Sequence, residues 1–293
     1  MTEKDSAPAP EVWSARRSRV GEATVYRALP QRPRRTVGAW CFLDYLGPGE
    51  PDDGGEGIGP HPHIGLQTVT WMLSGEMLHR DSLGSEQLIR PGELNLMTAG
   101  QGIVHAEERV GDSPVELAQL WVAQPSATRD GSSAFEHHGD LPRTEIGESE
   151  VTVLVGELAE LASPARRDTD HLGADIKLRG SASVPLHHAH EHVVVPLRGS
   201  VRVSGTMVES PHLAFLPPGR SGVELSSTSD ARVLLLGGEP FDEEVLMWWN
   251  YVARTRAQIS EAHAEWTARS ARFVVTDSVL PSIDVGPPPW ETG

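Results

Sequence analysis

The sequence predicts an all-β protein of two antiparallel β-barrels packed together, with a short C-terminal helix. Three observations support this fold class. Glycine and proline number 29 and 23 of the 293 residues, and this excess over average composition is typical of many turns between short strands. Apolar and β-branched segments of strand length recur between those turns. The order of strands and turns is also repeated once, roughly 120 residues further along the chain.

The first copy of this pattern begins at Gln67–Leu73, an apolar and β-branched segment that ends at the turn Ser74-Gly75. The strand pattern is interrupted again at Leu88–Gly92, where a turn is expected. A further strand is expected over Glu93–Thr98, before the small-residue turn Ala99-Gly100. We therefore expect strands connected by glycine turns in the first half of the chain.

The second copy begins at Val193–Leu197 and ends that strand at Arg198-Gly199. A short strand over Val201–Val203 follows, and His212–Leu216 runs to the turn Pro217–Gly219. The repeat indicates two homologous β-domains of roughly 120 residues each. The residues expected to fill the interior of the second barrel are Val193, Val195, Leu197 and Phe215.

One helix is expected near the end of the chain, over Thr255–Ser270. Ile259, Ala262 and Trp266 are spaced three and four residues apart, with charged residues between them, so they share one helix face. We expect this face to pack against a barrel. The aromatic pair Trp248-Trp249 is interpreted as core packing of the same closing segment.

These elements divide the chain into consecutive parts. The connection between the two copies is rich in Ser, Thr, His, Gly and Pro, as expected for a linker. The predicted parts are a disordered lead-in at 1–10, an N-terminal barrel at 11–130, a linker at 131–147, and a C-terminal barrel with the closing helix at 148–293.

Charge and cysteine content limit the classes of partner. Basic residues number 25 and acidic residues 41, a formal net charge of −16, which disfavours direct binding to nucleic acids or anionic membranes. The single cysteine, Cys41, leaves no intrachain disulfide framework, and its apolar neighbours indicate a buried, inert thiol. No segment is apolar enough for a membrane span, and Met1–Pro10 lacks a secretory signal. We expect a cytoplasmic monomer.

The strongest chemical signal is the motif His61-Pro62-His63. Two histidines at positions i and i+2 of a strand point to the same face of the sheet. The same spacing recurs downstream with His105 and Glu107. Two such pairs on neighbouring strands of a small barrel would meet inside it, so we predict a metal site there.

Three neutral imidazoles and one carboxylate suit Fe(II), Mn(II), Ni(II), Cu(II) or Zn(II), and the ligand types do not select one of these metals. Four protein ligands leave two octahedral positions for water, dioxygen or a chelating substrate. The alternative is two unrelated pairs of surface histidines in a chain that has 13 histidines. Because both pairs lie beside glycine-rich strand edges, the metal site is the better interpretation.

The histidine-rich segment His187–His192 is not expected to form a second metal site. When the two copies are aligned on their glycine turns, Pro185 takes the position of His61, and proline has no side-chain donor. We therefore expect a metal-free C-terminal barrel. The side chains expected on an exposed face or a domain boundary are His188, His190 and His192. The glycine-rich segment Gly47–Gly59 is expected to form a flexible flap beside the metal.

Several motifs together resemble a known family. They are Gly59–Gly65, Thr68–Thr70, His79–Gly84, Arg90–Gly92, Met97–Gly100, Gly102–Glu107, Leu236–Pro240 and Trp248–Val252. With these motifs the chain closely resembles the pirin family of the cupin superfamily, from about Trp13 to Trp290. The resemblance implies a bicupin of two β-barrels, with one iron ion, Fe(2+), per chain in the N-terminal barrel. The family's ligands fall on His61, His63, His105 and Glu107.

Some pirins are similar to quercetin 2,3-dioxygenases, so the resemblance implies a mononuclear iron oxygenase that opens a flavonol or similar enolic ring with dioxygen. Glu107 is the candidate base. The family usually has glutamate where this chain has Gln67, which would orient the substrate or a nearby water. The alternative is a non-enzymatic, iron-dependent regulatory protein that binds a protein partner. Oxygen consumption with quercetin and related enols distinguishes the two.

Overall fold

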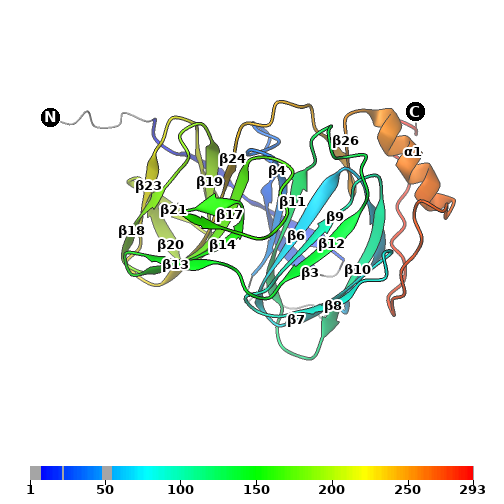
Figure 1. Ribbon diagram of the computed structural model, residues 1–293, viewed down its shortest axis with the longest axis horizontal. Coiled ribbons are helices and arrows are strands. Elements are labelled where there is room, and N and C mark those ends of the chain that lie inside the picture. The colour runs from blue at the N-terminus through cyan, green and yellow to red at the C-terminus, as the bar shows by residue number, and fades with distance from the viewer. Residues whose placement is uncertain (1–7, 22, 48–54, 293) are drawn as a thin grey trace. The chain divides into compact units, whose positions relative to one another are not determined.

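The computed structural model describes residues 8–21, 23–47 and 55–292 (Figure 1). Its strands pair in antiparallel sheets, and α1 (Arg256–Thr267) is the one α-helix within these ranges. The predicted all-β class with a short C-terminal helix is therefore confirmed. None of the helical segments in the described ranges has the length and apolar character that a membrane span requires.

The chain folds into two compact units, each built from segments that lie far apart in sequence. Unit 1 holds the described parts of residues 1–18, 26–45 and 140–241. Unit 2 holds those of residues 19–25, 46–139 and 242–293. This division differs from the predicted consecutive parts, because the helix packs with strands of the first half. Residues 1–7 of the predicted lead-in and 48–54 of the predicted flap lie outside the described residues.

Unit 2 contains a sheet of order β5-β10-β7-β8 and four neighbouring strands of a second sheet, in the order β12-β9-β6-β11. Alternate side chains of β6 point between the sheets, since the Thr70 hydroxyl reaches the Glu107 carboxylate of β10. The strands are β5 (Gly57–His63), β6 (Leu66–Ser74), β7 (Glu76–Asp81), β8 (Glu86–Ile89), β9 (Leu94–Thr98), β10 (Ile103–Val110), β11 (Glu116–Ala123) and β12 (Ala134–His138), and the separate pair β25 (Leu246–Trp248) and β26 (Tyr251–Ala253).

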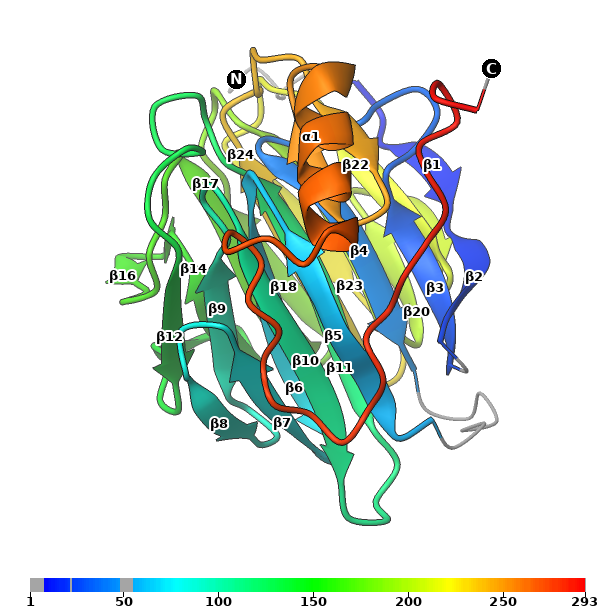
Figure 2. The same ribbon diagram turned by 90° about the vertical axis from the view of Figure 1, so that its right-hand side faces the viewer.

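Helix α1 begins with a capping box, in which Thr255 and Gln258 satisfy each other's backbone N–H groups. Its buried face carries the three predicted residues, Ile259, Ala262 and Trp266, so the predicted helix is confirmed. They form a core with Tyr251 and Phe273 of the same unit, and Trp248 and Trp249 pack against it, as predicted. Figure 2 shows α1 and the chain that follows it crossing β5 and β10.

Unit 1 contains the sheet β1-β22-β19-β24-β17-β14-β13 and the sheet β18-β23-β20-β21. Its strands are β1 (Glu11–Ser14), β4 (Trp40–Leu46), β13 (Arg143–Ile146), β14 (Ser149–Val155), β15 (Glu157–Leu158), β16 (Leu161–Ala162), β17 (His171–Leu178), β18 (Ser181–Pro185), β19 (Glu191–Arg198), β20 (Ser200–Val203), β21 (Thr206–Glu209), β22 (His212–Leu216), β23 (Gly222–Ser226) and β24 (Ala231–Gly238). Strands β2 (Arg16–Val20) and β3 (Ala23–Leu29) cross the division, and β3 pairs with β4 at Tyr26 and Tyr45.

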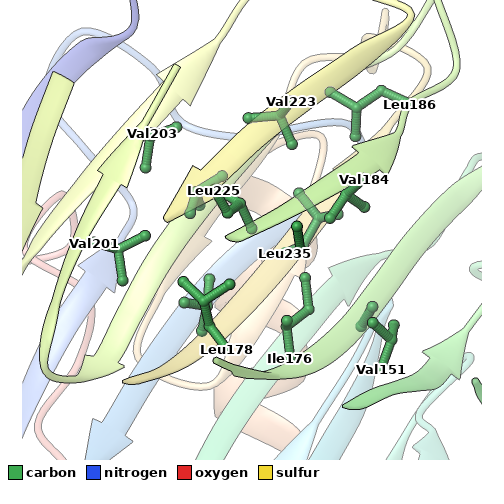
Figure 3. Close-up of a cluster of buried hydrophobic side chains, with 14 of the residues drawn as sticks. Val151, Ile176, Leu178, Val184, Leu186, Val201, Val203, Val223, Leu225 and Leu235 are labelled. Atoms are coloured by element: carbon green, nitrogen blue, oxygen red, sulfur yellow. The ribbon is translucent and has the colours of Figure 1, made fainter. Parts of the chain in front are cut away.

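The core of unit 1 lies between its two sheets. Figure 3 shows Ile176, Leu178 and Leu235 of the larger sheet facing Val201 and Leu225 of the smaller one. The side chains that fill this space are aliphatic and nearly all fully buried. The two sheets of the unit are therefore held together mainly by apolar burial.

The predicted interior of this unit is wrong by one residue along β19. Val194 belongs to the core between the sheets, whereas Val193 and Val195 alternate with it and are buried on the opposite face. Phe215 also lies outside that core and stacks on Trp13 at 4.8 Å between ring centroids. Because both faces of this sheet are buried, its strands read as continuous apolar runs and show no alternation.

The same shift changes the position of the histidine cluster. His192 shares the inward face of β19 with Val194 and is fully buried, and His190 is 7% exposed. Only His188 of the three lies at the surface, as the sequence predicted. Of the two predicted alternatives, an exposed face or a domain boundary, exposure is therefore wrong for His190 and His192. Cys41 is fully buried, as predicted.

Candidate metal centre

Three histidines meet between the sheets of unit 2. His61 and His63 lie on β5, and His105 lies on the neighbouring β10, directly opposite His61 in the strand register. The register shifts just beyond this pair, because β5 contains one more residue than β10 opposite Gly59-Pro60. Proline has no N–H to donate, so an irregular strand position suits it.

The three imidazole rings are packed closely around one point. Their centroids lie 4.4 Å apart for His61 and His105, and 4.9 Å apart for the other two pairs. One ring nitrogen from each residue lies within 4.8 Å of the other two. All three side chains are buried. The sequence prediction that the i,i+2 pair and His105 converge is therefore confirmed.

Backbone carbonyls fix the orientation of two of these rings. His61 Nδ1 lies 2.8 Å from the carbonyl oxygen of Gly59, and His63 Nδ1 lies 3.0 Å from that of Asn250. A carbonyl oxygen only accepts hydrogen bonds, so each Nδ1 carries the proton and each Nε2 carries a lone pair. Metal-binding histidines are oriented in this way in proteins.

Burial keeps the three imidazoles neutral. Loss of hydration lowers the pKa of His61 to about 4, although its hydrogen bond to the Gly59 carbonyl acts to raise it. The same cause lowers the pKa values of His63 and His105 well below the usual range, with further lowering from neighbouring histidines. Neutral, buried imidazoles with converging lone pairs are good ligands for a divalent transition metal, so the residues present fit such an ion.

Glu107 lies two residues beyond His105 but outside the group of mutually close ligand atoms. Its carboxylate lies 3.1 Å from the Thr70 hydroxyl, which also lies 2.9 Å from the side-chain oxygen of Gln119. Burial raises the pKa of Glu107, while His79 and the Thr70 hydrogen bond oppose that rise. The residue is therefore a buried acid beside three neutral imidazoles.

A fourth histidine, His79, adjoins the site and was not predicted. It lies opposite Glu107 on β7, 5.3 Å from His105 between ring centroids. Its Nε2 lies 3.1 Å from the carboxylate of Asp81, and its ring stacks on Phe135 at 4.2 Å. The i,i+2 spacing of His79 and Asp81 is the same signal that identified the other two pairs.

Gln67 lies on the other face of β6. The strand alternates regularly between Gln67 and Trp71 in its pairing with β9, and Thr70 points toward Glu107, so Gln67, three residues earlier, points away. Its amide nitrogen donates to Thr98, and its amide oxygen is buried without a hydrogen-bond partner among the described residues. The predicted orienting role of Gln67 therefore has no support from its position.

Comparison with known sequences identifies the family. Residues 22–122 match the family Pirin, and residues 173–274 match its C-terminal cupin domain. The chain belongs to the pirin family. The two pirin matches cover most of the chain, and the three converging histidines of this pirin lie in the first half of it. The C-terminal match extends over α1, although the helix packs within unit 2.

Relatives of this pirin match it over nearly its full length. A Pseudomonas aeruginosa protein provisionally named a quercetin 2,3-dioxygenase is 46% identical, over 92% of this chain and 88% of its own. A pirin-like protein of Caulobacter vibrioides is 33% identical, over 94% and 96%. The crystal structure of a quercetin 2,3-dioxygenase from Acinetobacter baumannii is 41% identical, with a TM-score of 0.92 over 96% of both chains.

Proposed function

We propose that this pirin is a flavonol 2,3-dioxygenase, which opens the ring of quercetin or a similar enolic substrate with dioxygen. The observation that carries the proposal is the buried group of His61, His63 and His105. Its support from relatives is the 41% identity and full-length match to a structure described as a quercetin 2,3-dioxygenase.

The proposal includes one Fe(II) ion per chain, held by the three histidines and by Glu107 as a fourth ligand. Glu107 lies two residues beyond His105 on β10, so both side chains point to the same face of the sheet. The metal would supply a Lewis acid for the enol and one-electron chemistry with dioxygen.

The protein's own part in the reaction is proton transfer and positioning. Glu107 takes the proton of the enolic hydroxyl at a carboxylate oxygen, because burial makes this carboxylate more basic than usual. In the metal-free protein, Thr70 holds this carboxylate through a hydrogen bond from its hydroxyl. Hydrogen bonds from His61 and His63 to backbone carbonyls keep their rings from turning.

Aromatic side chains beside the imidazoles favour a flat, aromatic substrate. Trp121 contacts His63 edge-on, with ring centroids 5.3 Å apart, and Phe135 lies flat against His79. Both aromatic residues belong to unit 2, as the histidines do. Planar rings stack favourably on aromatic side chains, which supports a flat substrate beside these imidazoles.

Oxygen uptake tests the proposal. The protein, loaded anaerobically with Fe(II), should consume dioxygen when quercetin is added and should not respond to luteolin, the matched flavone that lacks the 3-hydroxyl. A His63→Ala variant should be inactive, because one of the three imidazoles is gone. Absence of uptake with several flavonols and other enols, by fully iron-loaded protein, would reject the enzyme and favour an iron-dependent regulatory protein with a protein partner.

The proposal extends to the setting of the protein. We expect it to act as a monomer in the cytoplasm, where its buried cysteine, Cys41, stays reduced. Its net charge of −16 fits a small-molecule enzyme better than a nucleic-acid-binding protein. Sedimentation of the purified protein tests the monomeric state directly.

A further inference from the structure

A basic groove lies on unit 1, where three neighbouring strands of the larger sheet begin or end. It encloses about 310 Å³. It is formed by the end of β17, the end of β19 and the start of β24. The residues that line it are Lys177, Leu178, Arg179, Arg198, Asp230, Ala231 and Arg232. Four of these seven residues are basic, in a chain whose net charge is −16.

Three of the cations form a row across the sheet. Arg232 on β24 lies opposite Lys177 on β17 and, on its other side, opposite Arg198 on β19. Like charges that face one another directly across strands destabilise a sheet. Asp175 and Glu150 offset part of this repulsion, and a bound anion would offset more of it.

Each cation of this row contacts another group of unit 1. Asp175, which is 1% exposed, binds the Arg232 guanidinium through both carboxylate oxygens at 2.8–3.2 Å. Tyr45 shares a side-chain hydrogen bond with Arg198. Lys177 pairs with Glu150 at 2.6 Å. Such supports preorganise a binding site, because a ligand then pays less to order the side chains.

The remaining two charged residues of the groove are both exposed. Arg179 uses its backbone N–H to bind Ser149, and among the described residues its guanidinium has no partner. Asp230 is the one carboxylate among the seven lining residues. Arg179 can therefore turn toward a ligand, while Asp230 repels an anion.

We propose that this groove binds a small oxyanion, a phosphate or carboxylate group, through Arg179, Arg198 and Arg232. Planar guanidinium groups match the oxygens of such groups with paired hydrogen bonds. The groove lies in unit 1 and shares no residue with the histidine site of unit 2. The proposal is thus independent of the proposed oxygenase activity.

Calorimetric titration of the full-length protein with inorganic phosphate, and separately with succinate, tests this site. Saturable binding of at least one probe at millimolar concentration or tighter is expected. Arg179→Ala should weaken it roughly tenfold, as expected for loss of a charge-assisted hydrogen bond. Asp230→Asn should tighten it a few fold. Arg202→Ala removes an exposed arginine of the other sheet, bonded to Gly205, and should change nothing.

The two probes distinguish the chemistry of the group. Tighter binding of phosphate would assign a phosphate-bearing ligand, and tighter binding of succinate a carboxylate-bearing one. The site is rejected if neither probe binds saturably, or if Arg179→Ala binds as the unmodified protein does. Metal content and oxygen uptake should be unchanged in both groove variants, so failure of this proposal leaves the oxygenase proposal untouched.

Discussion

The Nε2 atoms of His63 and His105 lie 3.1 Å apart in the interior of unit 2. His63 Nε2 carries a lone pair, because its Nδ1 donates to Asn250. In the metal-free protein His105 must then donate to it, and His105 Nδ1 is left buried without a partner among the described residues. A bound metal would remove the need for this hydrogen bond, so the arrangement of the two rings fits a metal site.

Metal content is the first test. The protein should bind about one divalent ion per chain, and His105→Ala should reduce this strongly, because it removes one of the three converging imidazoles. The measurement is elemental analysis of protein purified without a histidine tag. His212→Ala, at an exposed position of β22, is the matched control and should bind metal normally. Full occupancy in the His105 variant would contradict the site.

Glu107→Gln separates metal binding from proton transfer. The amide keeps the size of the side chain and its contact with Thr70, but it cannot accept a proton. We expect part of the metal to remain on the three histidines, and oxygen uptake with quercetin to fall at least about tenfold. Glu86→Gln, on the exposed edge of the same sheet, is the control. Uptake at the unmodified rate would remove Glu107 from the reaction.

Gln67→Glu tests the face on which that residue lies. Restoring the family's usual glutamate should not raise oxygen uptake, because Gln67 points away from Glu107 and bonds to Thr98. Instead, a fully buried carboxylate should lower the free energy of unfolding by a few kcal/mol at neutral pH. Urea unfolding at pH 7 and oxygen uptake are measured together. A faster reaction would show that the residue reaches the substrate.

Gly65 lies in the turn between β5, which carries two of the three histidines, and β6. A Cβ atom here would lie 2.2 Å from the backbone oxygen of Val252, and φ is +66°. Gly65→Ala should therefore destabilise the protein by about 3 kcal/mol or more and reduce its metal content. Gly84 also has a positive φ, of +86°, but with open space around it, so Gly84→Ala should cost about 1 kcal/mol. Equal losses in denaturant unfolding would contradict the close contact.

His192 should make the stability of the protein sensitive to acid. Burial, and then the nearby His190 and His187, lower its pKa to about 3. Between the unfolded value near 6.5 and about 3, only the unfolded chain takes up this proton, so stability falls as pH falls, by up to about 1.4 kcal/mol per pH unit. His192→Leu should lose less stability between pH 7 and pH 5, in urea unfolding, than the unmodified protein.

The control for this experiment is His212→Leu, on the exposed end of β22. It should keep the full pH dependence. The comparison uses the change with pH within each protein, so any difference in packing at pH 7 cancels. The same loss in His192→Leu as in the unmodified protein would show that the residue can take up a proton while folded.

The sequence predicted the metal site because its spacing carries the geometry. His61 and His63 are two residues apart on one strand, so they share a face, and strand pairing then places His105 directly opposite His61. His79 has the same spacing to Asp81 and contacts His105, so the i,i+2 pattern also carries the signal for this fourth histidine.

Other features could not be read from local pattern. Gln67 lies beside the histidine motif in sequence, but strand alternation turns it away from the site, and only the pairing of β6 fixes that register. His192 follows a turn at His187–His190, which shifts the inward face by one residue. Both faces of β19 are buried, so the apolar pattern of this strand does not show which face points into the core. The interleaving of the units depends on strand pairs such as β1 with β22, which are about 200 residues apart.

The hydrogen bond from His63 to Asn250 joins residues 187 positions apart. A ribosome that has just added His105 has synthesised all three histidines but not the carbonyl that orients the second one. The residues that cross β5, such as Ile283, which donates to Pro60, come later still. The metal site would therefore reach its final geometry only after Asn250 and the residues that cross β5 have been synthesised.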